Sequence, residues 1–295
     1  MDSAHRTPLS GHARGILCIV ASAVFFGIAP SITALSYAGG NNPVNMAFLR
    51  ALLPLPLFFG LARKSLPLPQ ASLKDCILLG VLSFSCTLLL YSSYAFIPAG
   101  IATTFHFLYP LYVVVYEAAA RKQRPGKGTV TGLMLSLGGV FLFLEGGASS
   151  GFLMGLMLAC LSGVCYAAYI IALEKRAERL PLFARLAGMS VAGAALCGAI
   201  AGVTGSLTLA LTPKAWLFTL LAILLVAVAG TSLFQEGVRL ADGTQAAMFS
   251  LFEPLTSILM TLLLSGETLS RAKLLGCVLI LSGLALHMLG EHRRS

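Results

Sequence analysis

The sequence predicts an all-α integral membrane protein with ten transmembrane helices, arranged as two inverted five-helix repeats. Three observations lead to this prediction. The 295 residues are 57% hydrophobic and 11% charged, whereas about 25% of the residues in a soluble domain are charged. Apolar runs of bilayer-spanning length follow one another along the chain, with short polar breaks between them. The second half of the chain also repeats the residue pattern of the first half.

The composition excludes other classes of protein. A mean hydropathy of +0.88 means more apolar surface than one or two soluble domains of this length could bury. The formal charge of +9 is spread over short loops and does not form the basic surface of a nucleic-acid-binding protein. The seven cysteines lie in or beside apolar runs, without the spacing of metal ligands. We therefore expect no nucleic-acid partner, no metal and no cofactor.

The spans follow from the position of the breaks, because a spanning helix needs about 20 mainly apolar residues. The five spans of the first half are predicted at 15–36, 44–62, 74–96, 99–119 and 128–145. Those of the second half are predicted at 151–173, 182–203, 214–235, 243–264 and 272–290. Turn-forming or basic segments separate them, such as Gly39–Pro43, Arg121–Lys127 and Ala241–Gly243. We place the first repeat at 1–148 and the second at 149–295.

The loop charges predict the orientation of these spans. With the N-terminus in the cytoplasm, 16 Lys and Arg residues fall in cytoplasmic segments, and three, Lys214, Arg271 and Lys273, fall outside. Cytoplasmic loops carry an excess of Lys and Arg. We therefore expect a multi-pass protein of the plasma membrane, the bacterial inner membrane, with both termini in the cytoplasm.

The internal repeat is the strongest indication of function. A shift of 144 residues aligns Pro110 with Pro254 and brings a pair of glycines into register, Gly132 with Gly276 and Gly139 with Gly283. Because each repeat has five spans, the second repeat enters the membrane in the opposite sense. Secondary transporters use such inverted repeats to expose a midplane site to each side in turn.

Sequence motifs in the second half resemble the EamA repeat of the drug/metabolite transporter superfamily. The motifs are Glu253-Pro254, the turn Leu264–Ser270, which reads LSGETLS, and the helix segment Leu275–Gly283. The first half carries the pattern more loosely, with Tyr109-Pro110 in place of Glu-Pro. The resemblance implies ten helices, cytoplasmic termini and transport of small metabolites, usually export. It implies no particular substrate.

The fourth span carries the first candidate site. Thr103, His106 and Tyr109 lie on or beside one helical face, which also carries Glu117. Pro110 breaks the helix and frees a backbone carbonyl one turn earlier. Ionisable side chains within a span are expensive and are candidate site residues by default. We predict substrate contacts for Thr103, His106 and Tyr109, and ion coupling for Glu117. The alternative is that His106 donates to a backbone carbonyl and Tyr109 packs between helices.

The ninth span repeats this arrangement, with Ser250 and Glu253 beside the helix-breaking Pro254. A carboxylate near the middle of the membrane must be protonated, paired or in contact with water. Glu253 is therefore predicted as a proton-coupling or amine-binding group, and Ser250 as a substrate contact. The alternative for Glu253 is a neutral cap on the backbone that Pro254 frees.

Four further tyrosines are predicted to line a cavity, because a hydroxyl in mid-membrane needs a partner that lipid does not offer. Tyr91 and Tyr94 lie in the third span, and Tyr166 and Tyr169 in the sixth. Their alternative role is core packing. Arg50, in the second span, is predicted either to bind a substrate carboxylate, to pair with an acid such as Glu145, or to extend to the interface.

These features favour a secondary active exporter of amino acids or related metabolites. The chain has no P-loop motif, which argues against ATP-driven transport, and no HExxH motif, and we expect it not to be an enzyme. A multidrug or lipid-linked-sugar exporter of the same fold is the alternative, followed by a membrane enzyme or sensor. The expected partners are the lipid bilayer and a small-molecule substrate. GxxxG pairs such as Gly128 and Gly132 leave a homodimer open.

The orientation leads to a first prediction. In a cysteine-free background, single cysteines in the loops 121–127 and 175–185 should react only with reagents that reach the cytoplasm, and a cysteine at Lys214 should react from outside. Labelling of intact cells with a membrane-impermeant maleimide measures this. Labelling of either loop from outside would contradict the inverted-repeat topology.

Overall fold

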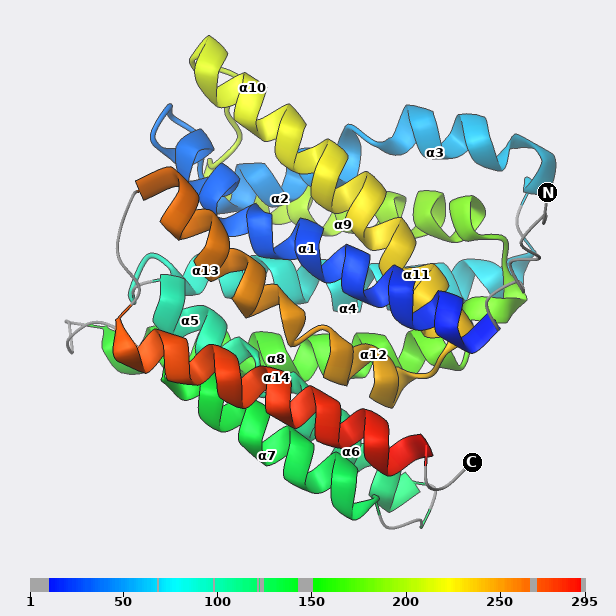
Figure 1. Cartoon of the computed structure of the whole chain (residues 1–295). Coiled ribbons are helices and arrows are strands. Elements are labelled where there is room, and N and C mark those ends of the chain that lie inside the picture. The colour runs from blue at the N-terminus through cyan, green and yellow to red at the C-terminus, as the bar shows by residue number, and fades with distance from the viewer. Residues whose placement is uncertain are drawn as a thin grey trace, which may run out of the picture.

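The computed structural model describes residues 11–67, 69–97, 99–120, 122, 125–142, 151–265 and 270–292, and regular structure there is helical (Figure 1). The first half comprises α1 (Gly11–Tyr37), α2 (Pro43–Leu52), α3 (Leu55–Ala62), α4 (Gln70–Ser93), α5 (Ala99–His106), α6 (Tyr109–Ala120) and α7 (Lys127–Phe141). The second half comprises α8 (Phe152–Glu174), α9 (Leu182–Thr204), α10 (Pro213–Ala222), η3 (Ile223–Gly230), α11 (Thr231–Leu240), α12 (Gly243–Phe249), α13 (Phe252–Ser265) and α14 (Arg271–His292). Two short 3₁₀ turns, η1 (Arg63–Ser65) and η2 (Ala177–Arg179), follow α3 and α8.

These elements form the ten predicted passes, because three passes consist of consecutive segments. They are α2–α3, α5–α6 and α12–α13, while α10, η3 and α11 run on without a break as the eighth pass. Seven stretches of the described residues are long and apolar enough to cross a membrane by length and composition. The other three passes are the broken α5–α6 and α12–α13, and α7, whose predicted end at 143–145 lies outside the described residues. The all-α, ten-helix prediction is confirmed.

Several helices begin where the sequence supplies a capping residue followed by proline or a small residue. The Asn42 side chain accepts from the Asn45 amide at 2.9 Å and Pro43 follows it, while Thr212 and Pro213 start α10 in the same way. The Asp242 carboxylate accepts from the Gln245 amide at 2.7 Å to start α12. Such caps satisfy the amide groups that have no partner in the first helical turn.

The packing of the helices has the exchange symmetry of an inverted repeat. In the first half α4 packs on α8, and in the second half the matching stretch, α11, packs on α1. Likewise α5 and α6 pack on α8, while α12 and α13 pack on α1. The start of α1 and the end of α14 lie at the same end of the bundle (Figure 1). Each of these contacts therefore has a counterpart in which the two repeats are exchanged.

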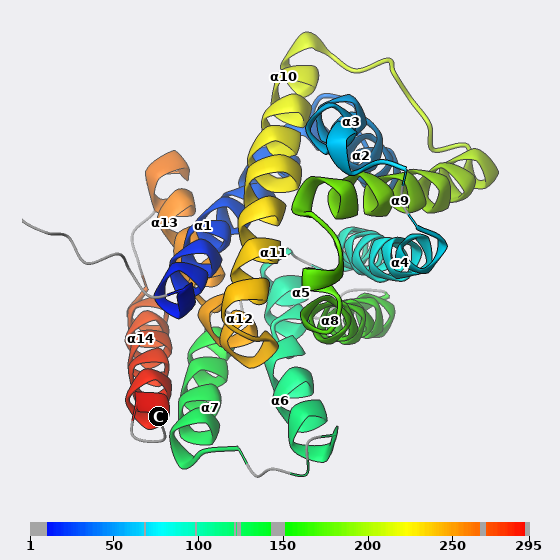
Figure 2. The same ribbon diagram turned by 90° about the vertical axis from the view of Figure 1, so that its right-hand side faces the viewer.

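The last helices of the two repeats, α7 and α14, pack closely along their length and lie on the opposite side of the molecule from α2, α3 and α9 (Figure 2). A Cβ added at Gly132 would overlap the Gly283 carbonyl oxygen, and one added at Gly139 would overlap that of Gly276. The 144-residue shift, which matches Gly132 with Gly276 and Gly139 with Gly283, converts each of these two contacts into the other. The glycines thus allow the backbones of symmetry-related helices to touch.

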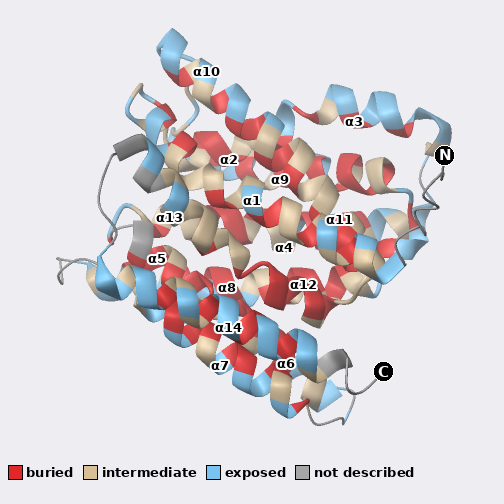
Figure 3. Cartoon of the chain, in the orientation of Figure 1, coloured by how far each residue is buried: buried red, intermediate tan, exposed pale blue. Residues whose placement is uncertain are grey.

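The outer surface is apolar, as a lipid-facing surface requires. Large hydrophobic side chains such as Leu153, Leu209 and Leu263 are 66%, 73% and 70% exposed. Exposed residues lie on the outer faces of α3, α10 and α14 (Figure 3). The boundary between the predicted repeats at 148–149, and Gly266–Leu269 in the LSGETLS turn, lie outside the described residues, so that boundary stays a prediction.

The close contact of α7 with α14 leads to a second prediction. Gly132→Ala should lower the free energy of unfolding by about 1–3 kcal/mol, because its methyl group meets backbone that must move. Gly138→Ala, on the same helix, is the matched control: a Cβ there meets nothing within 4 Å. It should be neutral or stabilise by up to about 1 kcal/mol. Thermal unfolding in detergent compares the two variants. Equal stability would show that the contact does not hold these helices together.

Candidate functional site

A central cavity with about 810 Å³ of empty space lies where the two repeats meet. Its walls come from α1, α2, α4 and α5 of the first repeat and α8, η3, α11 and α13 of the second. Seven of the predicted site residues line it: Tyr91, Tyr94, Thr103, His106, Tyr166, Tyr169 and Glu253. The structure thus brings together residues that are up to 162 positions apart in the sequence.

Broken helices surround this cavity. The fourth pass breaks at Phe107 and Leu108, and the ninth at Ser250 and Leu251. Because proline has no amide hydrogen, Pro110 cannot donate to the His106 carbonyl, nor Pro254 to that of Ser250. The Ser250 carbonyl instead accepts from the Glu253 amide at 2.9 Å. The Glu253 amide thus satisfies the carbonyl at the break, and the Glu253 carboxyl group is not needed for this.

The imidazole of His106 is held by a serine of the other repeat. His106 Nδ1 lies 2.9 Å from Ser162 Oγ, and Ser162 Oγ donates to the Ala159 carbonyl at 2.6 Å. Since the serine proton is already used, Ser162 Oγ accepts and Nδ1 carries a proton. In the neutral imidazole this leaves Nε2 as an acceptor. His106 is therefore fixed by a side chain, not by the backbone carbonyl that the alternative reading expected.

Aromatic rings form one wall of the cavity. Tyr166 stacks on Tyr169 and on Phe234, each with centroids 5.8 Å apart, and Phe26 lies 6.1 Å from Phe234. Rings at these separations attract one another beyond the burial of their area. Phe234 was not among the predicted site residues. Its sequence context, an apolar run shared with many lipid-facing residues, contained no signal to distinguish it.

A buried polar chain closes the cavity at the end that carries both termini. The Tyr169 hydroxyl accepts from Gln235 Nε2 at 3.0 Å, and Gln235 Oε1 accepts from Arg185 Nε at 2.7 Å. Arg185 is fully buried and also donates to the Ala177 and Leu180 carbonyls. This chain links α8, α9 and α11. The sequence indicated Arg185 only as a loop charge, because the contact depends on how three separate helices meet.

The cavity extends instead toward the other end. Tyr94 lies directly after α4, and Thr103 lies in the second turn of α5. Thr33, another lining residue, lies near the end of α1. Thr33 and Tyr94 thus lie at the ends of α1 and α4 away from the termini, and Thr103 lies one turn inward from the corresponding end of α5.

Three predicted site residues do not line the cavity. Ser250 is 1% exposed and its hydroxyl donates to the Ala246 carbonyl at 2.8 Å. Tyr109 is fully buried behind the wall, with its ring 4.7 Å from that of Tyr166 and 5.3 Å from that of His106. Glu117 lies on α6, outside the cavity lining. Within the described residues no group of three or more His, Cys, Asp or Glu side chains could hold a metal.

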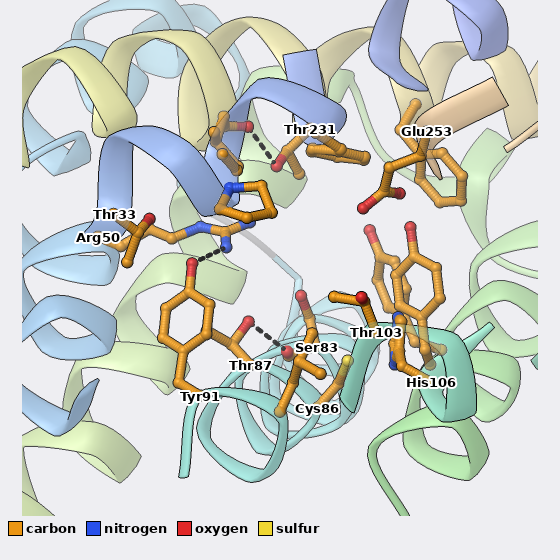
Figure 4. A pocket seen from close by; sticks show the side chains of 18 of the residues that line it. Thr33, Arg50, Ser83, Cys86, Thr87, Tyr91, Thr103, His106, Thr231 and Glu253 are labelled. Atoms are coloured by element: carbon orange, nitrogen blue, oxygen red, sulfur yellow. Dashed lines mark hydrogen bonds between the residues drawn. The ribbon is translucent and has the colours of Figure 1, made fainter. Parts of the chain in front are cut away.

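Two ionisable side chains, one basic and one acidic, face each other across the cavity. Arg50 extends from α2 on one side, next to Tyr91 and Thr33, and Glu253 lies on the other side near His106 (Figure 4). Arg50 Nη1 donates to the Tyr91 hydroxyl at 3.4 Å. Neither charged group forms an ion pair among the residues that the structure describes. Glu145, the predicted partner of Arg50, lies outside that part of the chain.

A ten-pass helical bundle with exchanged packing between its halves and a polar cavity at their seam is the architecture of a membrane transporter. The profile of the EamA-like transporter family matches the chain twice, over residues 13–145 and 153–289. The chain therefore belongs to the EamA-like transporter family.

Individual relatives agree with this assignment. The uncharacterized inner membrane transporter YicL of Salmonella typhimurium is 32% identical over 67% of this chain and 66% of its own length. The uncharacterized transporter sll1319 of Synechocystis is 28% identical over 70% of this chain and 64% of its own. The match thus spans just under two thirds of these two relatives. An uncharacterized transporter of Archaeoglobus fulgidus is 28% identical over 91% of this chain and 94% of its own.

A solved crystal structure has the same fold. It aligns with a TM-score of 0.78 and 21% identity over 94% of this chain and 98% of its own. At this identity the likeness shows the fold alone, and the family assignment rests on the profile match.

The geometry leads to a third prediction. His106→Ala and Tyr91→Phe should weaken substrate binding by a few-fold to about tenfold, because each removes about one hydrogen bond from the cavity wall. The measurement is ligand-induced thermal stabilisation, with amino acids, nucleosides, sugars and cationic drugs as probes. Tyr112→Phe is the matched control, since Tyr112 packs outside the cavity lining. Unchanged affinity in both cavity variants would place the substrate elsewhere.

Proposed function

We propose that the protein is a secondary active transporter that exports amino acids or related small zwitterionic metabolites across the bacterial plasma membrane by alternating access. One observation carries the proposal. The cavity at the seam of the two repeats holds one basic and one acidic side chain, Arg50 and Glu253, without an ion pair between them. A substrate with both charges would neutralise each of them, and the aromatic wall suits an apolar portion.

The difference between the two ends of the cavity supports alternating access. The chain Tyr169–Gln235–Arg185 closes the end with the termini, and the lining residues approach the other end. With cytoplasmic termini, as the loop charges predict, this arrangement is an outward-facing state. The inward-facing state would be produced by exchanging the conformations of the two repeats.

Glu253 is the group best placed for proton coupling. The backbone carbonyl that Pro254 frees accepts from the Glu253 amide, so the carboxyl group is not needed as a cap. It lies instead on the cavity wall. A carboxyl group there can take up a proton from one side and release it to the other, and intramembrane acids commonly serve this role.

A multidrug exporter is the second candidate, and the aromatic wall favours it. Tyr166, Tyr169 and Phe234 could stack on a planar cation, and Glu253 could balance its charge. In that case Arg50 would disfavour the ligand. Preferential thermal stabilisation by cationic drugs over amino acids would favour this candidate.

The role of Glu253 leads to a fourth prediction. In proteoliposomes, Glu253→Gln should abolish accumulation against a substrate gradient, because the variant cannot exchange a proton, and should leave substrate exchange measurable. Isotope uptake with and without an imposed pH gradient measures both. Glu236→Gln is the matched control: Glu236 pairs with Arg239 at 2.5 Å, outside the cavity lining. Uphill transport by Glu253→Gln at the wild-type rate would return Glu253 to a structural role.

A further inference from the structure

A side chamber with about 360 Å³ of empty space adjoins the central cavity at Arg50. Arg50, Ser83, Thr87 and Thr231 line both spaces, so these four residues form the junction between them. The chamber extends from this junction toward α3 and α9, where Ser190 is its further polar residue. Arg50 is the one ionisable side chain in the described lining of the chamber.

The guanidinium group of Arg50 has unused hydrogen-bonding capacity. It carries five N–H groups, and its one hydrogen bond within the described residues is the 3.4 Å contact to Tyr91. A cation held within a span without a counter-ion is unfavourable. A purely structural arginine would be expected to pair with a carboxylate or with helix-end carbonyls, as Arg185 does with Ala177 and Leu180.

The neighbouring hydroxyl groups divide into two kinds. Thr87 Oγ1 donates to the Ser83 carbonyl at 3.1 Å, and Thr231 Oγ1 donates to the Val226 carbonyl at 2.9 Å, so their protons are used (Figure 4). Within the described structure the hydroxyls of Ser83 and Ser190 donate to no group. The junction therefore offers a cation and one free O–H donor, from α2 and α4, and the adjoining chamber offers a second free O–H donor from α9.

We propose that Arg50, Ser83 and Ser190 form a subsite for the carboxylate of the transported molecule. This inference rests on the proposed transport function and names the group by which the substrate is recognised. A guanidinium binds a carboxylate through two parallel hydrogen bonds. A single cation also balances the single charge of a carboxylate, whereas a phosphate dianion would leave excess negative charge within the membrane.

The test uses probes that differ only in their charged groups. They are L-leucine and L-phenylalanine, their decarboxylated amines 3-methylbutylamine and 2-phenylethylamine, and their 2-oxo acids, with inorganic phosphate as a further probe. Dissociation constants are measured on the full chain in nanodiscs. Arg50→Gln should weaken binding of the amino acids and oxo acids by tenfold or more and leave the amines within about twofold. Arg50→Lys should retain part of the affinity, because lysine keeps the positive charge but cannot form two parallel hydrogen bonds to a carboxylate.

The hydroxyl groups provide a second, milder test that does not depend on the folding of an Arg50 variant. The double variant Ser83→Ala with Ser190→Ala should weaken the binding of the carboxylate probes several-fold. Thr87→Val is the matched control, since its hydroxyl proton is already used by the Ser83 carbonyl, and it should change their affinity less. Equal loss for acids and amines in these variants would overturn the proposal. So would wild-type binding of the amines alone, or of phosphate more tightly than any carboxylate.

Transport is measured separately by counterflow in proteoliposomes, so that the two proposals can fail independently. Arg50-dependent binding of carboxylates without counterflow would refute the transport function and retain the subsite. Counterflow of amino acids that is unaffected by Arg50→Gln would refute the subsite and retain transport.

Discussion

The structure depends on one constraint: within a bilayer, every backbone amide and carbonyl must be satisfied by the protein itself. Breaks in helices are tolerated only where protein or a cavity surrounds them. Here they occur at Leu53–Pro54 in the second pass, at Phe107–Leu108 and at Ser250–Leu251, and η3 forms a π-helical stretch at Ile223–Gly230. All four disturbed segments adjoin the central cavity or its side chamber. The unbroken helices α7 and α14 pack away from it.

The broken passes determine which side chains reach the cavity. Pro54 cannot donate to the Arg50 carbonyl, and Arg50 lies one turn before that break. Glu253 lies directly before Pro254, at the break of a pass from the other repeat. Two helix breaks thus present a basic and an acidic side chain to one space from opposite walls. The two breaks are not equivalent in the repeat, because the 144-residue shift matches Pro254 with Pro110 and the pass that corresponds to α2–α3 is the continuous helix α9.

Much of the fold could be read from the sequence because lipid imposes strong patterns on it. Span length, polar breaks and the 144-residue repeat led to the ten passes and to seven cavity-lining residues such as His106 and Glu253. Ser250 matched His106 in the repeat, yet its hydroxyl turns to the Ala246 carbonyl. The repeat is approximate, and a serine in a helix satisfies itself locally whenever no other partner is near.

The sequence by itself determined the class of protein, its spans, the inverted relation of its two halves and the family to which it belongs. The reason is that hydropathy and the spacing of glycine and proline are local properties of the chain. Only the tertiary structure decided that Arg50 faces the cavity without a counter-ion among the described residues, that Ser162 orients His106, and that Arg185 is buried against Gln235. These contacts join residues from different helices. Their geometry depends on how the helices pack, and a long polar side chain in a span has several environments open to it until that packing is known.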